Sequence, residues 1–334
     1  MRRCLVILGI AWLTSMAALT AETGSVSPTA GEQISRMGIG INLGNTFDAP
    51  NGEGTWCPEP ARSAYFDDFK AVGFKHVRLP VTWGNHMQAT PPYAVDPKFL
   101  NRIAEVVGWA TQRGLVVVLN AHHEEWFKID PAAQMVRLEA LWRQLATRFK
   151  GVPDQFLVFE ILNESDEKHI TAAQTTEMND RILRIIRETN PARCVILGGI
   201  GDNADHMMKE LVLPNDPYII ATYHCYDPWF FVSGAPRNPA EEKWGSGEQK
   251  AEYVQTMDRV KKWSDTHNVP VYLGEWATSI KCAPQSRLEY YRFVPAQAAA
   301  RGFSDAIWDD GGDMQIYDRK TRKWNTAILH AVFP

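Results

Sequence analysis

Short apolar runs alternate with longer amphipathic stretches along most of the chain. The short runs are rich in β-branched residues and apolar without interruption, which indicates strands buried on both faces, as in parallel sheets. They cover residues 37–42, 76–80, 115–120, 156–162, 195–198, 219–223, 271–274 and 305–308. The longer stretches repeat apolar residues at spacings of three and four, which predicts helices over residues 97–113, 134–149, 172–189 and 248–267.

This alternation predicts the fold class. Eight strands joined by helical crossovers fit a closed (β/α)8 barrel, the TIM barrel of the α/β class. The alternative is an open doubly wound sheet, which would need a glycine-rich phosphate loop after the first strand. Gly38, Gly40 and Gly44 have the wrong spacing for such a loop. No linker, repeat or low-complexity segment divides the rest of the chain, so we expect residues 22–334 to form a single barrel domain.

The first residues follow a different pattern. Arg2 and Arg3 precede an apolar run that ends in small residues near Ala21, which is typical of a secretory signal peptide. The apolar run is at the short limit for spanning about 30 Å of hydrocarbon, so a membrane anchor is the less favoured interpretation. We therefore predict that residues 1–21 are a signal peptide and that the mature protein is secreted, to the periplasm or the extracellular space, with no membrane attachment.

Composition excludes two classes of protein. The chain has 334 residues, a net charge of −4 and 45% hydrophobic residues, so it can bury a large core and is not disordered. No run of Lys and Arg occurs, which argues against a nucleic-acid partner. No coiled-coil pattern is present either, and we expect a monomer.

Four cysteines follow the predicted signal peptide: Cys57, Cys194, Cys225 and Cys282. In an oxidising compartment they would allow one or two disulfides, with three full pairings that the sequence does not distinguish. In a domain of this size they can also be buried small hydrophobic residues. No CxxC or HExxH spacing occurs, so we expect no structural zinc site.

Polar and ionisable residues gather where the apolar runs stop. In a TIM barrel these carboxyl ends of the strands form the active site. Seven of the eight runs end in such residues, and the fifth ends in glycines. The residues are Asn42, Asn45, Asp48, Arg78, His122, His123, Glu124, Glu125, Asn163, Glu164, His224, Tyr226, Glu275, Trp276, Trp308, Asp309 and Asp310.

Two of these residues, Glu164 and Glu275, suggest a reaction. They follow the fourth and seventh runs, so they would face each other across the barrel mouth. Cleavage of a glycosidic bond needs such a pair, about 5–5.5 Å apart for retention and about 6.5–9.5 Å for inversion, with one carboxyl protonated and the other ionised. Arg78 beside a carboxylate would keep it ionised. Trp276 and Trp308 offer flat apolar faces of the kind against which sugar rings stack.

At these positions the chain resembles glycoside hydrolase family 5, the cellulase and mannanase family, over about residues 37–324. The segments that carry the resemblance are GINLGNTFDAP (residues 40–50), HVRLP (76–80), NAHHEE (120–125), FEILNE (159–164), HCY (224–226), LGEW (273–276) and Trp308. The resemblance implies that Glu164 is the general acid/base and Glu275 the nucleophile. It also implies that Asn163 binds the sugar 2-hydroxyl.

The resemblance assigns the other strand-end side chains as well. Tyr226 and Arg78 would hold Glu275 and keep it ionised. The side chains that would line the site and bind sugar are His122, His123, His224 and Trp308, with Trp308 as the platform beneath the sugar. Asn45 and Asp48 match positions that contact sugars in the branch of broad-specificity endoglucanase/mannanases.

Two segments depart from the family pattern. Ser165 follows the catalytic pair where the family usually has proline, so residues 163–165 also fit a glycosylation sequon. A strand-end asparagine beside the acid would be a poor acceptor. Asp309 and Asp310 follow Trp308 where relatives often carry a glutamate and an aromatic residue.

Several other residues have two interpretations. Glu160 is better explained as a buried structural carboxylate than as a catalyst. Glu124 and Glu125 beside two histidines could suggest a metal cluster, but adjacent residues on a strand point to opposite faces, and we expect no metal and no cofactor. The loop aromatics, which are Trp56, Trp126 and those of residues 227–244 with Trp229 foremost, are either sugar platforms or local core.

These observations predict a retaining endo-β-1,4-glucanase that hydrolyses a β-linked polysaccharide by double displacement. A β-mannanase or a xyloglucanase is the alternative, because the same glutamate pair serves all three and loop shape sets the substrate. A non-catalytic carbohydrate-binding barrel is a remote alternative. Such a barrel should lack one glutamate or its supporting residues, whereas both glutamates are present here.

Overall fold

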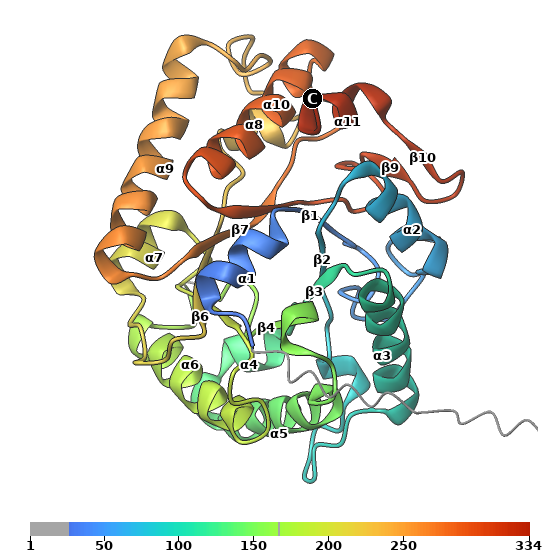
Figure 1. The fold of residues 1–334 in the computed structure, drawn as a ribbon, viewed down its shortest axis with the longest axis vertical. Coiled ribbons are helices and arrows are strands. Elements are labelled where there is room, and N and C mark those ends of the chain that lie inside the picture. The colour runs from blue at the N-terminus through green and yellow to red at the C-terminus, as the bar shows by residue number, and fades with distance from the viewer. Residues whose placement is uncertain (1–26, 166–167) are drawn as a thin grey trace, which may run out of the picture.

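The computed structural model describes residues 27–165 and 168–334 (Figure 1). Eight parallel strands form a closed barrel in chain order, which confirms the predicted (β/α)8 fold. The strands are β1 (Ile39–Asn42), β2 (His76–Leu79), β3 (Val116–Asn120), β4 (Leu157–Glu160), β5 (Val195–Gly198), β6 (Ile219–His224), β7 (Val271–Trp276) and β8 (Ser304–Ile307). A short antiparallel pair, β9 (Tyr317–Asp318) and β10 (Lys323–Trp324), follows the last barrel strand.

Helices surround the barrel (Figure 1). They are α1 (Ala30–Met37), α2 (Ser63–Val72), α3 (Pro97–Gln112), α4 (Glu125–Ile129), α5 (Pro131–Phe149), α6 (Ala172–Arg187), α7 (Ala204–Glu210), α8 (Trp229–Val232), α9 (Gly247–His267), α10 (Pro284–Ala300) and α11 (Thr326–Val332). Two single 3-10 turns cover Gly84–His86 and Asp154–Phe156. The four predicted helices are all present, with ends displaced by up to three residues.

Local sequence explains where the helices begin. Helix α5 starts three residues earlier than predicted because Pro131 occupies its first position and Asp130 accepts a hydrogen bond from the Ala133 amide. Helix α9 starts at Gly247 because Ser246 and Gln249 form a reciprocal capping box.

The barrel strands bury both faces, as their continuous apolar sequence predicts. One cluster fills the barrel interior and includes Val116, Val118, Val158, Ile196, Ile220 and Tyr272. A second, larger cluster lies between the sheet and the helices. Helix α1 packs Ile34 and Met37 onto the interior cluster, so it closes the amino-terminal end of the barrel, and Figure 1 shows it lying across that end.

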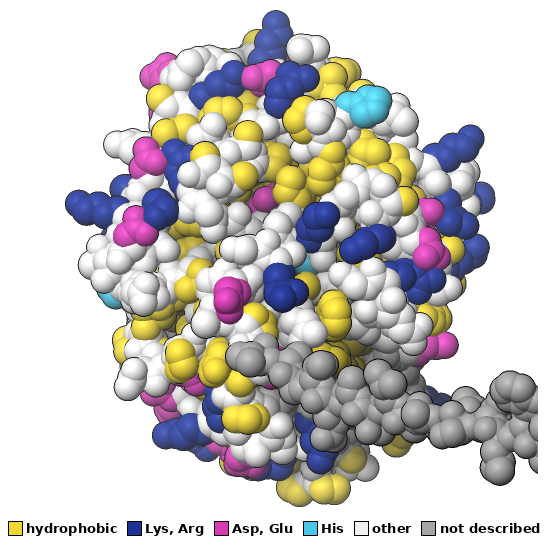
Figure 2. Space-filling model, viewed as in Figure 1, with side chains coloured by type: hydrophobic (Ala, Val, Ile, Leu, Met, Phe, Trp, Pro, Cys, Tyr) yellow, Lys and Arg dark blue, Asp and Glu magenta, His cyan; other side chains and the backbone are white. Residues whose placement is uncertain are grey.

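Figure 2 shows the molecule from the same side. Acidic and basic side chains are interspersed over this face, with hydrophobic side chains between them, which agrees with the small net charge of −4. The carboxyl ends of the strands point to the other end of the barrel.

The four cysteines are all buried with free thiols. The interpretation of Cys57, Cys194, Cys225 and Cys282 as buried small residues is therefore confirmed, and no disulfide joins them. The predicted signal peptide, residues 1–21, lies outside the described residues. Within the described part of the chain, no helix combines the length and the apolar character that crossing a membrane requires.

Candidate active site

Two glutamates meet at the carboxyl ends of the strands. Glu164 follows β4 and Glu275 lies in β7. One carboxylate oxygen of each and a ring nitrogen of His224 all lie within 4.8 Å of one another. The Glu275 side chain is 6% exposed, whereas that of Glu164 is 43% exposed. One carboxylate therefore sits at the base of the site, and the other is open to a ligand.

Arg78 organises the base of the site. Its Nη1 donates to Glu275 Oε1 at 2.5 Å and to Asn42 Oδ1 at 3.0 Å. Its Nε and Nη2 donate to the two oxygens of Glu160 at 2.7 and 2.8 Å, and Nη2 also donates to Asn163 Oδ1 at 2.7 Å. All five N–H groups of the buried guanidinium thus have acceptors, as a buried charge requires. Glu160 is engaged by this fork, in keeping with a structural role.

The same contact orients Asn163. Because its Oδ1 accepts from Arg78, its amide NH2 is directed away from the guanidinium. Asn163 is buried and immediately precedes the exposed Glu164. The amide is therefore presented as a hydrogen-bond donor beside the Glu164 carboxylate.

Tyr226 holds the second oxygen of Glu275. Its hydroxyl donates to Glu275 Oε2 at 2.8 Å, while Arg78 occupies Oε1. Burial and the neighbouring Glu275 charge hold the pKa of Tyr226 well above its usual range, so the hydroxyl remains a donor. Glu275 is thereby fixed at both oxygens.

His224 links the two glutamates. Its Nδ1 lies 2.8 Å from Glu164 Oε1 and 3.9 Å from Glu275 Oε2. Burial alone would lower the pKa of His224, but the surrounding carboxylates, Glu275 first, outweigh it and raise that pKa to about 9. Burial likewise favours the neutral form of Glu164, yet the His224 hydrogen bond and charge lower its pKa below the usual range. At neutral pH the pair therefore shares one proton, held mainly on the imidazole.

Two further histidines and a tryptophan form one side of the site. The His122 ring is parallel to Trp308, with centroids 5.8 Å apart and planes 8° apart, and it is edge-on to His123 at 4.5 Å. Trp308 approaches the chain closely at Gly44, where a side chain would lie 2.7 Å from the indole. Burial lowers the pKa of both histidines, so they are neutral donors and acceptors.

Asn45 and Asp48 lie in the loop after β1. The Asp48 carboxylate is fully buried and accepts from the backbone amides of Asn45 at 3.0 Å and Thr46 at 2.8 Å. These bonds hold the turn in which Asn45 has a φ of 52°. The predicted sugar contacts of both residues stay predictions, and for Asp48 the structure supplies a structural role.

Glu124 also serves the framework. Its carboxylate accepts from the backbone amides of Trp83 at 2.6 Å and Gly84 at 2.9 Å, and from the Trp126 indole at 2.5 Å. Trp126 is further covered by the Arg137 guanidinium, 4.1 Å from its ring. Of its two interpretations, Trp126 therefore fits local packing.

Three groups of acidic and imidazole side chains are close enough to hold a metal ion. They are Asp48–His122–His123, Glu160–Asp202–His224 and Glu164–His224–Glu275. In each group a carboxylate is already bound by internal donors, such as the backbone amides at Asp48 or the Arg78 guanidinium at Glu160 and Glu275. A cationic guanidinium beside the ligands opposes a second cation.

Two exposed tryptophans flank the site. Trp56 is 49% exposed and its ring centroid lies 5.5 Å from that of His123. Trp229 is 54% exposed and lies 6.4 Å from Tyr226. In contrast, Trp244, which lies in the same connection between β6 and α9 as Trp229, is buried. Both exposed rings offer flat apolar surfaces beside residues of the site.

One residue of this site, Asp202, was not predicted from the sequence. The fifth run ends in glycines, but Asp202, four residues after Gly198, is buried, and its Oδ2 accepts the Glu164 backbone amide at 2.8 Å. Its signal was an isolated aspartate in a glycine-rich loop at the correct end of the barrel. That signal is weak because such loops commonly use aspartate for turns.

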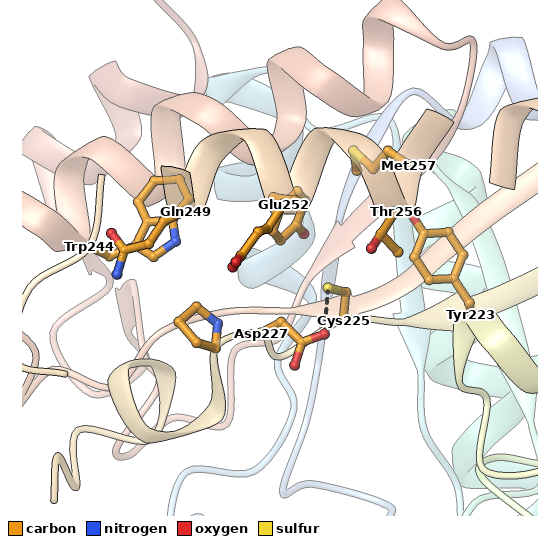
Figure 3. Close-up of a pocket in the computed structure, with 10 residues that line it drawn as sticks. Tyr223, Cys225, Asp227, Trp244, Gln249, Glu252, Thr256 and Met257 are labelled. Atoms are coloured by element: carbon orange, nitrogen blue, oxygen red, sulfur yellow. Dashed lines mark hydrogen bonds between the residues drawn. The ribbon is translucent and has the colours of Figure 1, made fainter. Parts of the chain in front are cut away.

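A separate cavity of about 350 Å³ lies behind β6, between the strand and α9. Figure 3 shows Glu252, Thr256 and Met257 of α9 opposite Cys225 and Asp227. Cys225 Sγ lies 3.9 Å from Asp227 Oδ2, and burial raises the pKa of this thiol to about 12, so it is not a reactive thiolate. The cavity thus lies on the side of β6 that faces α9, and β6 carries His224.

Comparison with known proteins identifies the family. The family description "Cellulase (glycosyl hydrolase family 5)" matches residues 40–313. Endoglucanase H of Acetivibrio thermocellus is 43% identical over 94% of this chain, which spans 35% of that protein's length. Endoglucanase B of Clostridium cellulovorans is 32% identical over 92% of this chain and 76% of its own length.

Solved structures agree. Endoglucanase Cel5A from the hyperthermophilic Thermotoga maritima superposes with a TM-score of 0.86 at 32% identity, covering 91% of this chain and all of that one. The same Cel5A has been solved in complex with mannotriose and with cellobiose. The chain belongs to the cellulase family, glycosyl hydrolase family 5.

Proposed function

We propose that this chain is a retaining endo-β-1,4-glucanase, with Glu164 as general acid/base and Glu275 as nucleophile. The observation that carries the proposal is the carboxylate pair, whose nearest oxygens lie within 4.8 Å. That separation suits the short spacing of about 5–5.5 Å for retention and leaves no room for the water of an inverting enzyme. The endoglucanase relatives support the substrate class.

The reaction runs in two displacements. Glu275 Oε attacks the anomeric carbon while the bond to the leaving oxygen breaks, and that oxygen takes the proton from Glu164. This step leaves a glycosyl ester on Glu275 and an ionised Glu164. Water then attacks the same carbon, Glu164 takes its proton, and Glu275 leaves as a carboxylate. Arg78 and Tyr226 hold the nucleophile in position before and after each step.

The Glu164–His224 pair supplies the proton for the first displacement. In the free site the imidazole holds it, 2.8 Å from Glu164. A bound polysaccharide covers the half-exposed Glu164 and removes water, which disfavours the separated charges of carboxylate and imidazolium. Substrate binding thereby moves the proton to Glu164, where the leaving oxygen collects it.

An extended polysaccharide fits the position of the exposed aromatic residues. Trp56 lies beside His123, Trp229 lies beside Tyr226, and Trp308 lies beside His122. Both mannotriose and cellobiose bind Cel5A of T. maritima, so a β-mannanase activity is the second candidate. The mannose 2-hydroxyl is axial, and the Asn163 amide is the group that would have to accommodate it.

We also propose that residues 1–21 are a signal peptide, that residues 22–334 form the secreted catalytic domain, and that this domain acts as a monomer. The charged start and the apolar run support export. Amino-terminal sequencing of the exported protein tests the signal peptide, and light scattering tests the monomer. A mature protein that begins at Met1, or a stable dimer, would contradict them.

The test of function compares four substrates. The mature protein and Glu275→Ala are incubated with carboxymethylcellulose, barley β-glucan, glucomannan and xyloglucan, and reducing ends are followed. We expect release from the two glucans that is lost in the variant. Release from glucomannan or xyloglucan alone would keep the mechanism and change the substrate. Binding without release from any of the four would contradict catalysis.

A further inference from the structure

The loop after β5 places the Asp202 carboxylate against the backbone of Glu164 and near the ring of His224. Asp202 is 1% exposed. Its Oδ2 accepts the Glu164 backbone amide at 2.8 Å, and its own carbonyl accepts the His224 backbone amide at 2.7 Å. Asp202, in the loop after β5, thus fixes the backbone of Glu164 after β4 and of His224 at the end of β6. These two strands lie on either side of β5 in the barrel.

The backbone at this point needs such support. Glu164 has a φ of 38° and Asp202 has a φ of 45°, a strained region that residues with a side chain adopt rarely. Gly201 donates to the Ser165 carbonyl at 2.7 Å, which joins the two loops. At Gly198 a side chain would lie 1.8 Å from Asp202 Oδ1, so the carboxylate fills the space that this glycine leaves.

The Asp202 carboxylate also faces the far side of the His224 ring. Nδ1 of the ring bonds Glu164 at 2.8 Å, and Nε2 lies 3.9 Å from Asp202 Oδ2. Among the described residues, neither this Nε2 nor Asp202 Oδ1 has a hydrogen-bond partner, and both are buried. The ring is seated on Gly274, where a side chain would lie 2.7 Å from Nε2. The Asp202 carboxylate, the His224 imidazole and the exposed Glu164 carboxylate therefore lie in one row.

We propose that Asp202 is a positioning residue for the acid/base: it fixes the backbone of Glu164 and keeps a proton on the His224 ring that faces Glu164. The inference rests on the proposed function and extends it to a residue outside the seven family segments. It predicts that the alkaline limit of activity is set by the Asp202–His224–Glu164 row rather than by Glu164 alone.

The charges around the imidazole decide the sign of the expected shift. The groups that face it are the carboxylates Glu164, Asp202, Glu275 and Glu160, the last of which is bound by the cationic Arg78, with the neutral His122 beyond. Burial raises the pKa of Asp202 to about 7, so its charge is present on the alkaline side. Loss of that charge removes one of the carboxylates that raise the pKa of His224, so the proton should leave at lower pH.

The test is Asp202→Asn, because asparagine keeps an acceptor for the Glu164 amide but not the charge. We expect the alkaline limit of kcat/KM on barley β-glucan to move down by about one pH unit. We also expect kcat near neutral pH to fall roughly tenfold, with a smaller loss on an activated aryl cellobioside, whose leaving group needs little protonation. Asp205→Asn, an exposed residue of α7 paired with Arg259, is the matched control and should change neither.

An unmoved alkaline limit, or equal losses on both substrates, would overturn the proposal. A second measurement does not depend on the folding of the Asp202→Asn variant. Nitrogen-15 NMR of the native protein, with the signal assigned through His224→Gln, should show His224 protonated above pH 8. Titration at or below its ordinary value near 6.5 would overturn the proposal too. If His224 is protonated but no glucan is hydrolysed, the proposed function is contradicted, whereas the inferred arrangement of Asp202, His224 and Glu164 is not.

Discussion

At the scale of single residues, the site depends on groups that have no freedom to rearrange. Arg78 uses all its N–H donors on four side chains, and Glu275 has both oxygens bound. Glu164 alone keeps an exposed carboxylate. In the proposed mechanism, two displacements at one carbon require a rigidly held nucleophile, Glu275, and an accessible acid, Glu164.

The role of Glu164 can be tested through the leaving group. Glu164→Gln removes the proton donor but keeps a hydrogen-bonding side chain beside His224. We expect kcat/KM on barley β-glucan to fall by about 10²–10⁴-fold, because general acid catalysis supplies a factor of that size. The rate of the first step on an activated aryl cellobioside should fall far less, because its aryl leaving group departs without protonation. Steady-state rates on the two substrates give the comparison, and equal losses would contradict the assignment.

At the scale of elements, the strands were predicted more closely than the residues that join them. Each barrel strand is buried on both faces, so its apolar run marks it almost without ambiguity. Helix starts were less exact because one capping hydrogen bond decides them, as Asp130 does for α5. Asp202 could not be found, because its role depends on the approach of Ser165 and Gly201 between loops that are far apart in sequence.

Two neighbouring strands offer a matched pair of buried tyrosines. The Tyr223 hydroxyl on β6 borders the cavity of Figure 3 and has no hydrogen-bond partner among the described residues. The Tyr272 hydroxyl on β7 lies 3.0 Å from His76 Nε2. Because His76 Nδ1 must donate to the Met37 carbonyl at 2.7 Å, Nε2 of the neutral ring accepts from Tyr272.

We therefore expect opposite results from the same chemical change. Tyr223→Phe should leave the free energy of unfolding unchanged or raise it slightly, because an unpaired buried hydroxyl is removed. Tyr272→Phe should lower it by about 1–3 kcal/mol, because the His76 nitrogen loses its donor. Urea unfolding at neutral pH measures both, and a clear loss of stability in Tyr223→Phe would show that its hydroxyl is bonded.

At the scale of the whole molecule, buried ionisable groups of the barrel link stability to pH in opposite directions. Burial lowers the pKa of His76 to about 4, below its unfolded value of about 6.5. Its contribution is therefore complete above pH 6.5 and is lost as the pH falls toward 4. Burial raises the pKa of Asp305 to about 7, only partly offset by the Trp276 indole that donates to it at 2.8 Å. Between about pH 4 and pH 6.5 the contributions of His76 and Asp305 therefore change in opposite directions and largely cancel.

Asp305 allows this linkage to be measured by one substitution. The unfolded chain releases the Asp305 proton near pH 4 and the folded chain near pH 7, so the folded state binds more protons in between and stability falls as pH rises. Asp305→Asn keeps an acceptor for the indole and cannot ionise. Relative to the native chain, the variant should gain up to about 4 kcal/mol in unfolding free energy between pH 4 and pH 7. Urea unfolding at several pH values measures that difference, with the exposed Asp313→Asn as control. A difference that stays constant with pH would mean that the buried carboxyl is ionised in the folded barrel.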